Sequence, residues 1–118
     1  MTLATNYLGL KLKSPLVVAA GPISRDISNL RKLEDSGAAA VVLKSLFEQE
    51  VEYQSGKLDF YLHYGAERFA ESITYFPEIS ETVSPTPEEY LDYIREAKKA
   101  VDIPIIASLN GVSNSGWV

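Results

Sequence analysis

The sequence contains no cysteine and only one histidine, His63. Without cysteine, disulfide bonds and thiolate chemistry are excluded within these 118 residues. A single histidine with no cysteine cannot complete the usual nitrogen and sulfur metal sites, so we expect His63 to have a packing or surface role. The lack of cysteine also fits a reducing compartment, and we expect a cytoplasmic protein.

Basic residues, long apolar runs and nucleotide-binding motifs are also scarce. Eleven Lys and Arg against sixteen Asp and Glu give a formal net charge of −5, and no basic stripe offers a nucleic-acid surface. No apolar run approaches the roughly 18 residues of a membrane span, and residues 1–6 lack the pattern of a secretory signal. Neither a glycine-rich phosphate loop nor a Ser-His-acid set is present. We therefore expect neither nucleic acid nor a membrane as a partner.

Three short apolar runs each end in small, polar or charged residues. The runs cover 16–20, 41–43 and 103–107. Such runs predict strands that are buried on both faces, as in a parallel sheet. Ligand sites of α/β folds lie at the carboxyl edge of the strands. The residues that follow the three runs are therefore candidate site residues, and they are Gly21, Lys44, Ser45, Ser108 and Asn110.

Two helices are predicted between these strands. The first covers 24–36, with Ser24 or Asp26 as its cap and Gly37 at its end. Its apolar side consists of Ile27, Leu30 and Leu33.

The second helix covers 86–101 and begins with a capping box of Thr86 and Glu89, with Pro87 at the first helical position. Its buried stripe is predicted to consist of Tyr90, Leu91, Ile94, Ala97 and Val101.

The order of elements predicts one partial α/β domain. Residues 1–15 form an N-terminal hairpin with alternating residues over 8–13, and 16–44 form the first βαβ unit. Residues 45–85 form an insertion over the strand ends, and 86–118 supply a helix, the third strand and a loop. A central strand without a covering helix predicts a piece of a longer chain. The alternative is a small domain that closes its sheet with another copy, as a homo-oligomer.

The insertion is acidic and aromatic. Between 45 and 85 there are eight acidic and two basic residues, and eight of the twelve aromatic residues of the chain. The acidic run is interpreted as a solvated surface, while the aromatic residues favour packing.

Lys44 is the leading candidate, because lysine is seldom buried without a partner or a task. At a strand end it can bind an anion, form a Schiff base or place positive charge near an electron-accepting ring. The alternative is an ion pair with Glu48 or Glu50.

Small and hydroxyl-bearing residues form the second group of candidates. Ala19, Ala20 and Gly21 allow a flat ring to lie against backbone, or they form a plain turn. Ser45, Ser108 and Asn110 either hydrogen-bond a ligand or satisfy loop backbone.

Four stretches spread between residues 7 and 91 belong together as a set, and they are 7–16, 19–22, 33–45 and 87–91. As a set they resemble the dihydroorotate dehydrogenase family, particularly its soluble, dihydroorotate dehydrogenase-like members. The resemblance implies a flavoprotein oxidoreductase of pyrimidine biosynthesis that oxidises dihydroorotate to orotate with FMN. It implies the N-terminal portion of a TIM-type (β/α)8 barrel with a hairpin beneath it. An incomplete barrel of this length is expected to have little activity alone.

The same resemblance implies roles for the candidate residues. Ala19, Ala20 and Gly21 would lie along the flavin through backbone contacts. Lys44 would reach both the flavin and the carboxylate of a small, orotate-like anionic substrate, and Ser45 would hydrogen-bond the flavin. Either Ser108 or Asn110 would also contact FMN. Residues 72–77 lack the asparagine that the family's substrate loop carries, so dihydroorotate itself is implied less firmly than the cofactor.

Two other functions are compatible with the residues. Lys44 could be the Schiff-base lysine of a lyase-type barrel. Alternatively, the insertion could be a non-catalytic docking surface, with Phe60, Tyr61 and Tyr64 at its centre.

Overall fold

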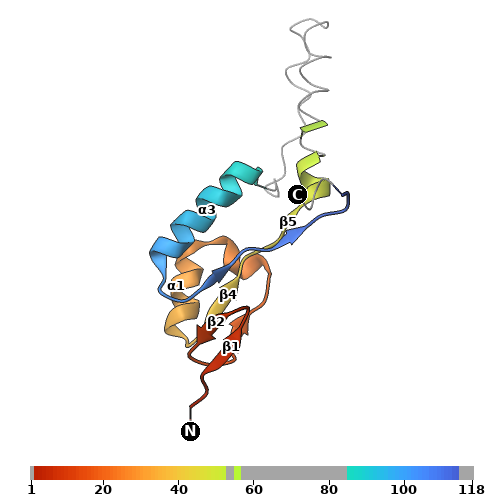
Figure 1. The fold of residues 1–118 in the computed structure, drawn as a ribbon. Coiled ribbons are helices and arrows are strands. Elements are labelled where there is room, and N and C mark those ends of the chain that lie inside the picture. Colours follow the sequence, from red (N-terminus) through yellow and green to blue (C-terminus); the bar gives the residue numbers. More distant parts are fainter. Residues whose placement is uncertain (1, 53–54, 57–84, 115–118) are drawn as a thin grey trace, which may run out of the picture.

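Three short parallel strands form the centre of the fold (Figure 1). A computed structural model describes residues 2–52, 55–56 and 85–114, and its central sheet contains β3 (Val17–Val18), β4 (Ala40–Val42) and β6 (Ile105–Ile106). The strand order is β3-β4-β6, with Val18 paired to Val41 and Val41 paired to Ile105. All three strands therefore end at the same edge, and the mixed α/β class is confirmed. The described residues contain no closed barrel.

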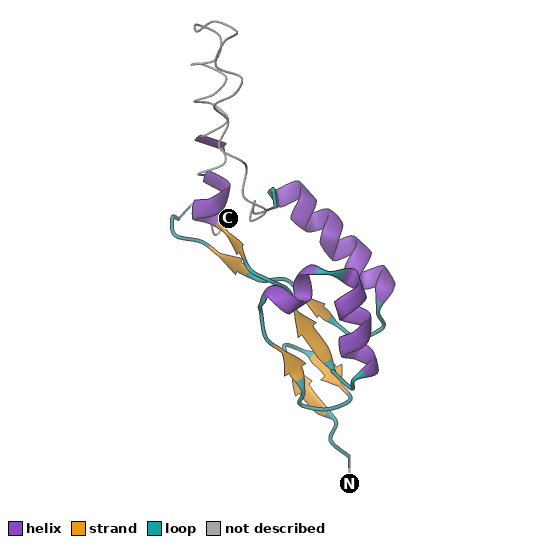
Figure 2. Ribbon diagram, turned by 180° about the vertical axis from the view of Figure 1, so that it is seen from behind, coloured by secondary structure: helices purple, strands orange, loops and turns teal. Residues whose placement is uncertain are grey.

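Helices α1 (Ile27–Asp35) and α3 (Pro87–Ala100) lie together on one side of the strands (Figure 2). Beneath them, Leu30, Val41 and Leu43 are fully buried in one apolar cluster. Burying a side chain of this size stabilises the fold by about 1.5–3 kcal/mol. Glu34 adds a polar link, because its Oε1 accepts hydrogen bonds from the Asp102 N–H at 2.8 Å and the Ile103 N–H at 3.1 Å.

The N-terminal hairpin packs against the amino-terminal part of the sheet. It consists of β1 (Thr5–Tyr7) and β2 (Leu10–Leu12), which pair antiparallel. Leu8 and Gly9, with φ of 50° and 76°, form the two-residue turn, so of the alternating residues at 8–13 only Leu10–Leu12 form a strand. Leu12 packs with Ala39 and Ala40 in a second cluster.

The first helix begins later than predicted. Residues Pro22–Arg25 form a separate 3-10 turn, η1, and α1 begins only at Ile27. Asp26 is the cap, since its Oδ1 accepts a hydrogen bond from the Ser28 N–H at 2.8 Å. The hydrogen bonds from Ser28 lower the pKa of Asp26. The predicted end is confirmed, because Gly37 follows the helix with φ of 99°.

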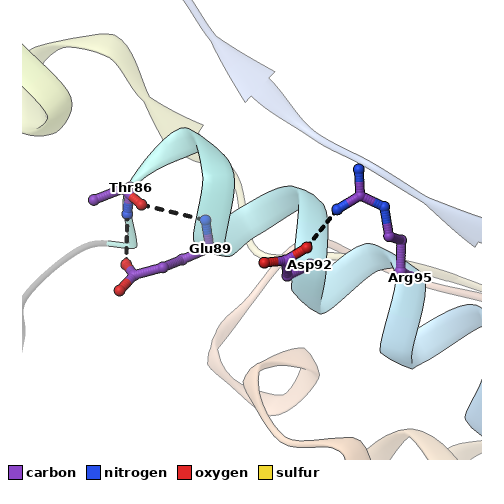
Figure 3. Close-up of polar contacts among 4 residues, drawn as sticks. All are labelled: Thr86, Glu89, Asp92 and Arg95. Carbon is purple, nitrogen blue, oxygen red and sulfur yellow. Dashed lines mark hydrogen bonds and ion pairs between the residues drawn. The ribbon is translucent and has the colours of Figure 1, made fainter.

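The start of α3 is as predicted (Figure 3). Thr86 Oγ1 accepts a hydrogen bond from the Glu89 N–H at 3.2 Å, and Glu89 Oε2 accepts one from the Thr86 N–H at 2.8 Å. On the exposed side of the helix, Asp92 and Arg95 form an ion pair, which contributes little at such a site.

One residue of the predicted stripe on α3 was wrong. Leu91 is 51% exposed, whereas Tyr93 is half-buried against the core. The reason is the helical period: Tyr93 and Ile94 follow Tyr90 by three and four residues, but Leu91 lies about 100° away around the helix.

The prediction of strands buried on both faces holds only for the middle strand. Ala40 and Val41 in β4 are fully buried. In contrast, Leu16 is 65% exposed, and Ile105 and Ile106 are half-buried. Within the described part of the chain, β3 and β6 are edge strands, so each has a neighbour on one side only.

A second parallel pair continues the sheet beyond its carboxyl edge and was not predicted. It consists of β5 (Leu46–Phe47) and β7 (Leu109–Asn110). Most of the predicted insertion, including His63 and all its aromatic residues except Phe47, lies outside the described residues. No helix in the described part is long and apolar enough to cross a membrane.

Candidate functional site

The carboxyl edge of the central sheet brings the predicted site residues together. Because Val18 pairs with Val41 in a parallel pair, the residues that follow β3 and β4, among them Gly21 and Lys44, leave the sheet at the same edge. Ala19 and Ala20 are exposed, and a Cβ built on Gly21 would meet only the Ala19 carbonyl oxygen, at 3.9 Å. The backbone at 19–21 is therefore accessible to a flat ligand.

An extra residue lies between β4 and β5. Val42 pairs with Ile106 and Leu46 pairs with Leu109, so three residues on one strand oppose two on the other. The Leu43 N–H donates to the Ile106 carbonyl at 2.8 Å, and the next rung is the Leu46 N–H to the Ser108 carbonyl at 2.9 Å. This arrangement is a β-bulge at the end of the central strand.

The bulge turns two consecutive side chains away from the helices. Leu43 and Leu46 both belong to the buried cluster on the helix side. Regular alternation would allow only one residue between them on the opposite side, but the bulge places Lys44 and Ser45 there together. Both are half-buried, and among the described residues no hydrogen bond reaches either backbone N–H and no ion pair involves Lys44. The edge thus presents an ammonium group, a hydroxyl group and backbone donors.

Ser45 and Ser108 meet across the bulge. Their Oγ atoms are 2.6 Å apart and share a hydrogen bond. Asn110, the other candidate on this segment, lies exposed in β7, paired with Phe47. The structure therefore joins Ser108, and not Asn110, to the Lys44–Ser45 pair.

Tyr90 holds the Ser108 backbone of this cluster by hydrogen bonds, although the sequence predicted it only as a core residue. It is 9% exposed, and its hydroxyl donates to the Ser108 carbonyl at 3.2 Å and accepts from the Ser108 N–H at 3.1 Å. The signal available in the sequence was a tyrosine in an otherwise aliphatic stripe, because a buried tyrosine hydroxyl usually has a hydrogen-bond partner.

Glu48, one of the two acids considered as partners for Lys44, bonds instead to a loop. Its carboxylate accepts hydrogen bonds from the Val112 N–H and from both the N–H and the hydroxyl of Ser113. The Ser113 hydroxyl and these two N–H groups lower the pKa of Glu48. This contact fixes the chain beyond β7, and among the described residues no ion pair joins Glu48 to Lys44.

Tyr93 holds the other loop at the edge. Its hydroxyl donates to the carbonyl of buried Ser24 at 2.7 Å, and Ser24 Oγ donates to the Gly21 carbonyl at 2.9 Å. Burial, with the charges of Asp26 and Glu96, raises the pKa of Tyr93 to about 12. Helix α3 thus anchors the loops on both sides of the candidate site.

The chemistry of the cluster is that of hydrogen-bond donation to an anionic or carbonyl-bearing ligand. The described residues contain no group of three or more acidic or histidine side chains that could hold a metal ion. Lys44, Ser45 and Ser108 offer donors of the kind that the polar edge of a flavin or a carboxylate accepts.

Comparisons with protein-family models, with curated proteins and with solved structures found no match for this chain. The choice of function therefore depends on the residues at the edge and on their geometry.

Proposed function

We propose that this chain supplies the flavin-contacting edge of an FMN-dependent oxidoreductase of the dihydroorotate dehydrogenase type, built on a (β/α)8 barrel. The observation that carries the proposal is the bulge, which directs Lys44 and Ser45 together away from the helices. The accessible backbone at Gly21 follows the neighbouring strand β3 at the same edge of the sheet.

The donors match the electronic demand of a flavin. A reduced flavin carries negative charge near N1 and the C2 carbonyl, and a nearby cation stabilises it. Lys44 supplies that cation, and Ser45 and Ser108 supply hydroxyl groups beside it. The exposed backbone of Ala19 and Ala20 offers a surface on which a flat ring can rest.

The same lysine suits a small carboxylate substrate. An ammonium group at a strand end binds a carboxylate as a point charge without demanding a bidentate geometry. Bound FMN would supply hydride acceptance, while Lys44 would orient the substrate by its carboxylate. A dihydroorotate-like acid fits this division of roles.

Flavin binding by the 118-residue chain tests the proposal. We expect the chain to quench FMN fluorescence, and we expect Lys44→Ala to weaken binding about 10-fold or more, because a hydrogen bond from a charged donor is lost. Lys11→Ala is the matched control, since Lys11 is exposed on the hairpin that packs at the other end of the sheet.

The proposal fails if the wild-type chain does not bind FMN, or if Lys44→Ala binds it as tightly as Lys11→Ala does. A parallel treatment with a keto acid and borohydride separates the lyase alternative. Covalent trapping at Lys44 would favour Schiff-base chemistry in place of flavin chemistry.

A further inference from the structure

The hydroxyl of Tyr90 contacts a single residue, Ser108, twice. It donates to the Ser108 carbonyl at 3.2 Å and accepts from the Ser108 N–H at 3.1 Å. The same carbonyl also accepts the Leu46 N–H at 2.9 Å. Both the N–H and the carbonyl of Ser108 are therefore bonded to residues of other segments, namely Tyr90 and Leu46.

The contact between Tyr90 and Ser108 replaces a hydrogen bond between strands that the bulge removes. Evenly spaced parallel bonding would direct the Ser108 N–H to a carbonyl of the neighbouring strand. The extra residue among 43–45 interrupts the ladder at this point, and the phenolic oxygen of Tyr90 takes the N–H instead. Without the hydroxyl, the partly buried N–H of Ser108 would lose its hydrogen-bond partner, and the Ser108 carbonyl would keep only the bond from the Leu46 N–H.

Fixing the Ser108 backbone also fixes its side chain. The Oγ of Ser108 lies 2.6 Å from the Oγ of Ser45, and one of the two hydroxyl protons forms the bond between them. The second proton is then available to a ligand beside Lys44. The direction of that donor depends on the position of the Ser108 backbone.

We propose that Tyr90 is a positioning residue for ligand binding, which holds the Ser45–Ser108 hydroxyl pair so that one hydroxyl donates to the ligand. This inference rests on the proposed flavin site for the identity of the ligand. The clamp on Ser108 can be tested without any ligand.

The first experiment is a double-mutant cycle on FMN affinity, with Tyr90→Phe, Ser45→Ala and the double variant. Tyr90→Phe keeps the aromatic ring and removes only the hydroxyl. We expect each single change to weaken FMN binding about fivefold, and the double change to weaken it by little more. Tyr7→Phe, at an exposed tyrosine of β1, is the matched control and should bind as the wild type does.

A merely structural role for Tyr90 gives different results. Tyr90→Phe would then lower the melting temperature but leave FMN affinity unchanged well below it, or its effect would multiply with that of Ser45→Ala to about 25-fold. Either result overturns the proposal.

The second experiment measures amide hydrogen exchange in the chain without FMN. We expect the Ser108 and Leu46 amides to exchange faster in Tyr90→Phe and to stay unchanged in Tyr7→Phe. If the wild type does not bind FMN but exchange rises as expected, the flavin assignment fails, while the contact by which Tyr90 holds the Ser108 backbone is supported. Unchanged exchange at Ser108 overturns the positioning role whatever the ligand.

Discussion

Replacing Tyr93 with phenylalanine removes the hydroxyl that joins α3 to the 3-10 turn before α1. That hydroxyl donates to the carbonyl of Ser24 at 2.7 Å, and Ser24 is fully buried. A buried carbonyl left without its partner costs about 1–3 kcal/mol. Because Tyr93 itself is half-buried and water can reach part of the site, we expect the free energy of unfolding to fall by about 1 kcal/mol.

The raised pKa of Tyr93 determines how the stability depends on pH. It is raised from 10.0 to about 12, first by burial and then by the charges of Asp26 and Glu96. A gap of about two pKa units corresponds to a loss of about 2.7 kcal/mol of stability between pH 10 and 12, which solvent screening at a half-exposed phenol reduces to about 1 kcal/mol. A raised pKa means that the contribution is complete below about pH 10 and is lost as the pH rises towards 12.

Urea unfolding followed by circular dichroism at several pH values measures both effects. At pH 8 we expect Tyr93→Phe to be less stable than the wild type by about 1 kcal/mol, while Tyr7→Phe stays within about 0.5 kcal/mol. The difference between the wild type and Tyr93→Phe should shrink between pH 10 and 12. Equal stability of the two phenylalanine variants, or a difference that stays constant up to pH 12, would refute the reasoning.

Three further changes test other parts of the fold. Leu30→Ala removes a fully buried side chain and should lower the free energy of unfolding by about 3 kcal/mol in urea; a loss below about 1 kcal/mol would contradict its burial. Thr86→Ala should cost about 1 kcal/mol through the lost cap, whereas Thr86→Ser should restore most of it. The lowered pKa of Glu48 means that its contacts are complete above its ordinary value of 4.5 and are lost as the pH falls below it. Amide exchange at Val112 and Ser113, corrected for its intrinsic pH dependence, should therefore lose protection in acid, and Glu48→Ala should lack that protection at pH 7.

Features that depend on neighbouring residues were the ones the sequence predicted well. The capping box of Thr86 and Glu89 and the glycine stop at Gly37 involve contacts within a few residues. Parallel strands joined by helices also follow from element order, because such connections require parallel pairing. The position of Lys44 at the carboxyl edge could therefore be predicted as well.

Features that depend on pairing between distant segments were missed. The Ser45–Ser108 bond joins residues 63 apart in sequence, and the bulge exists only through the change of register between two ladders. One signal was present: the buried residues Val41, Leu43 and Leu46 are spaced by two and then by three, which marks a change of phase in the strand.

The burial of apolar residues was mispredicted where their position in the sheet matters more than the apolar composition of their segment. The run at 16–20 is as apolar as a central strand, yet Leu16, which precedes β3, is exposed, and β3 has one neighbour among the described strands. The cap of α1 was left open between Ser24 and Asp26, and the structure shows that it is Asp26, while Ser24 lies buried within η1.

Because an extra residue follows Val42, the number of residues between β4 and β5, and not only their identity, decides which side chains lie at the sheet edge. A chain lacking Ser45 would bring Leu46 into phase with Leu43 and allow an unbroken run of rungs towards β7. Such a shortened chain would have a more regular sheet but only one polar side chain directed away from the helices.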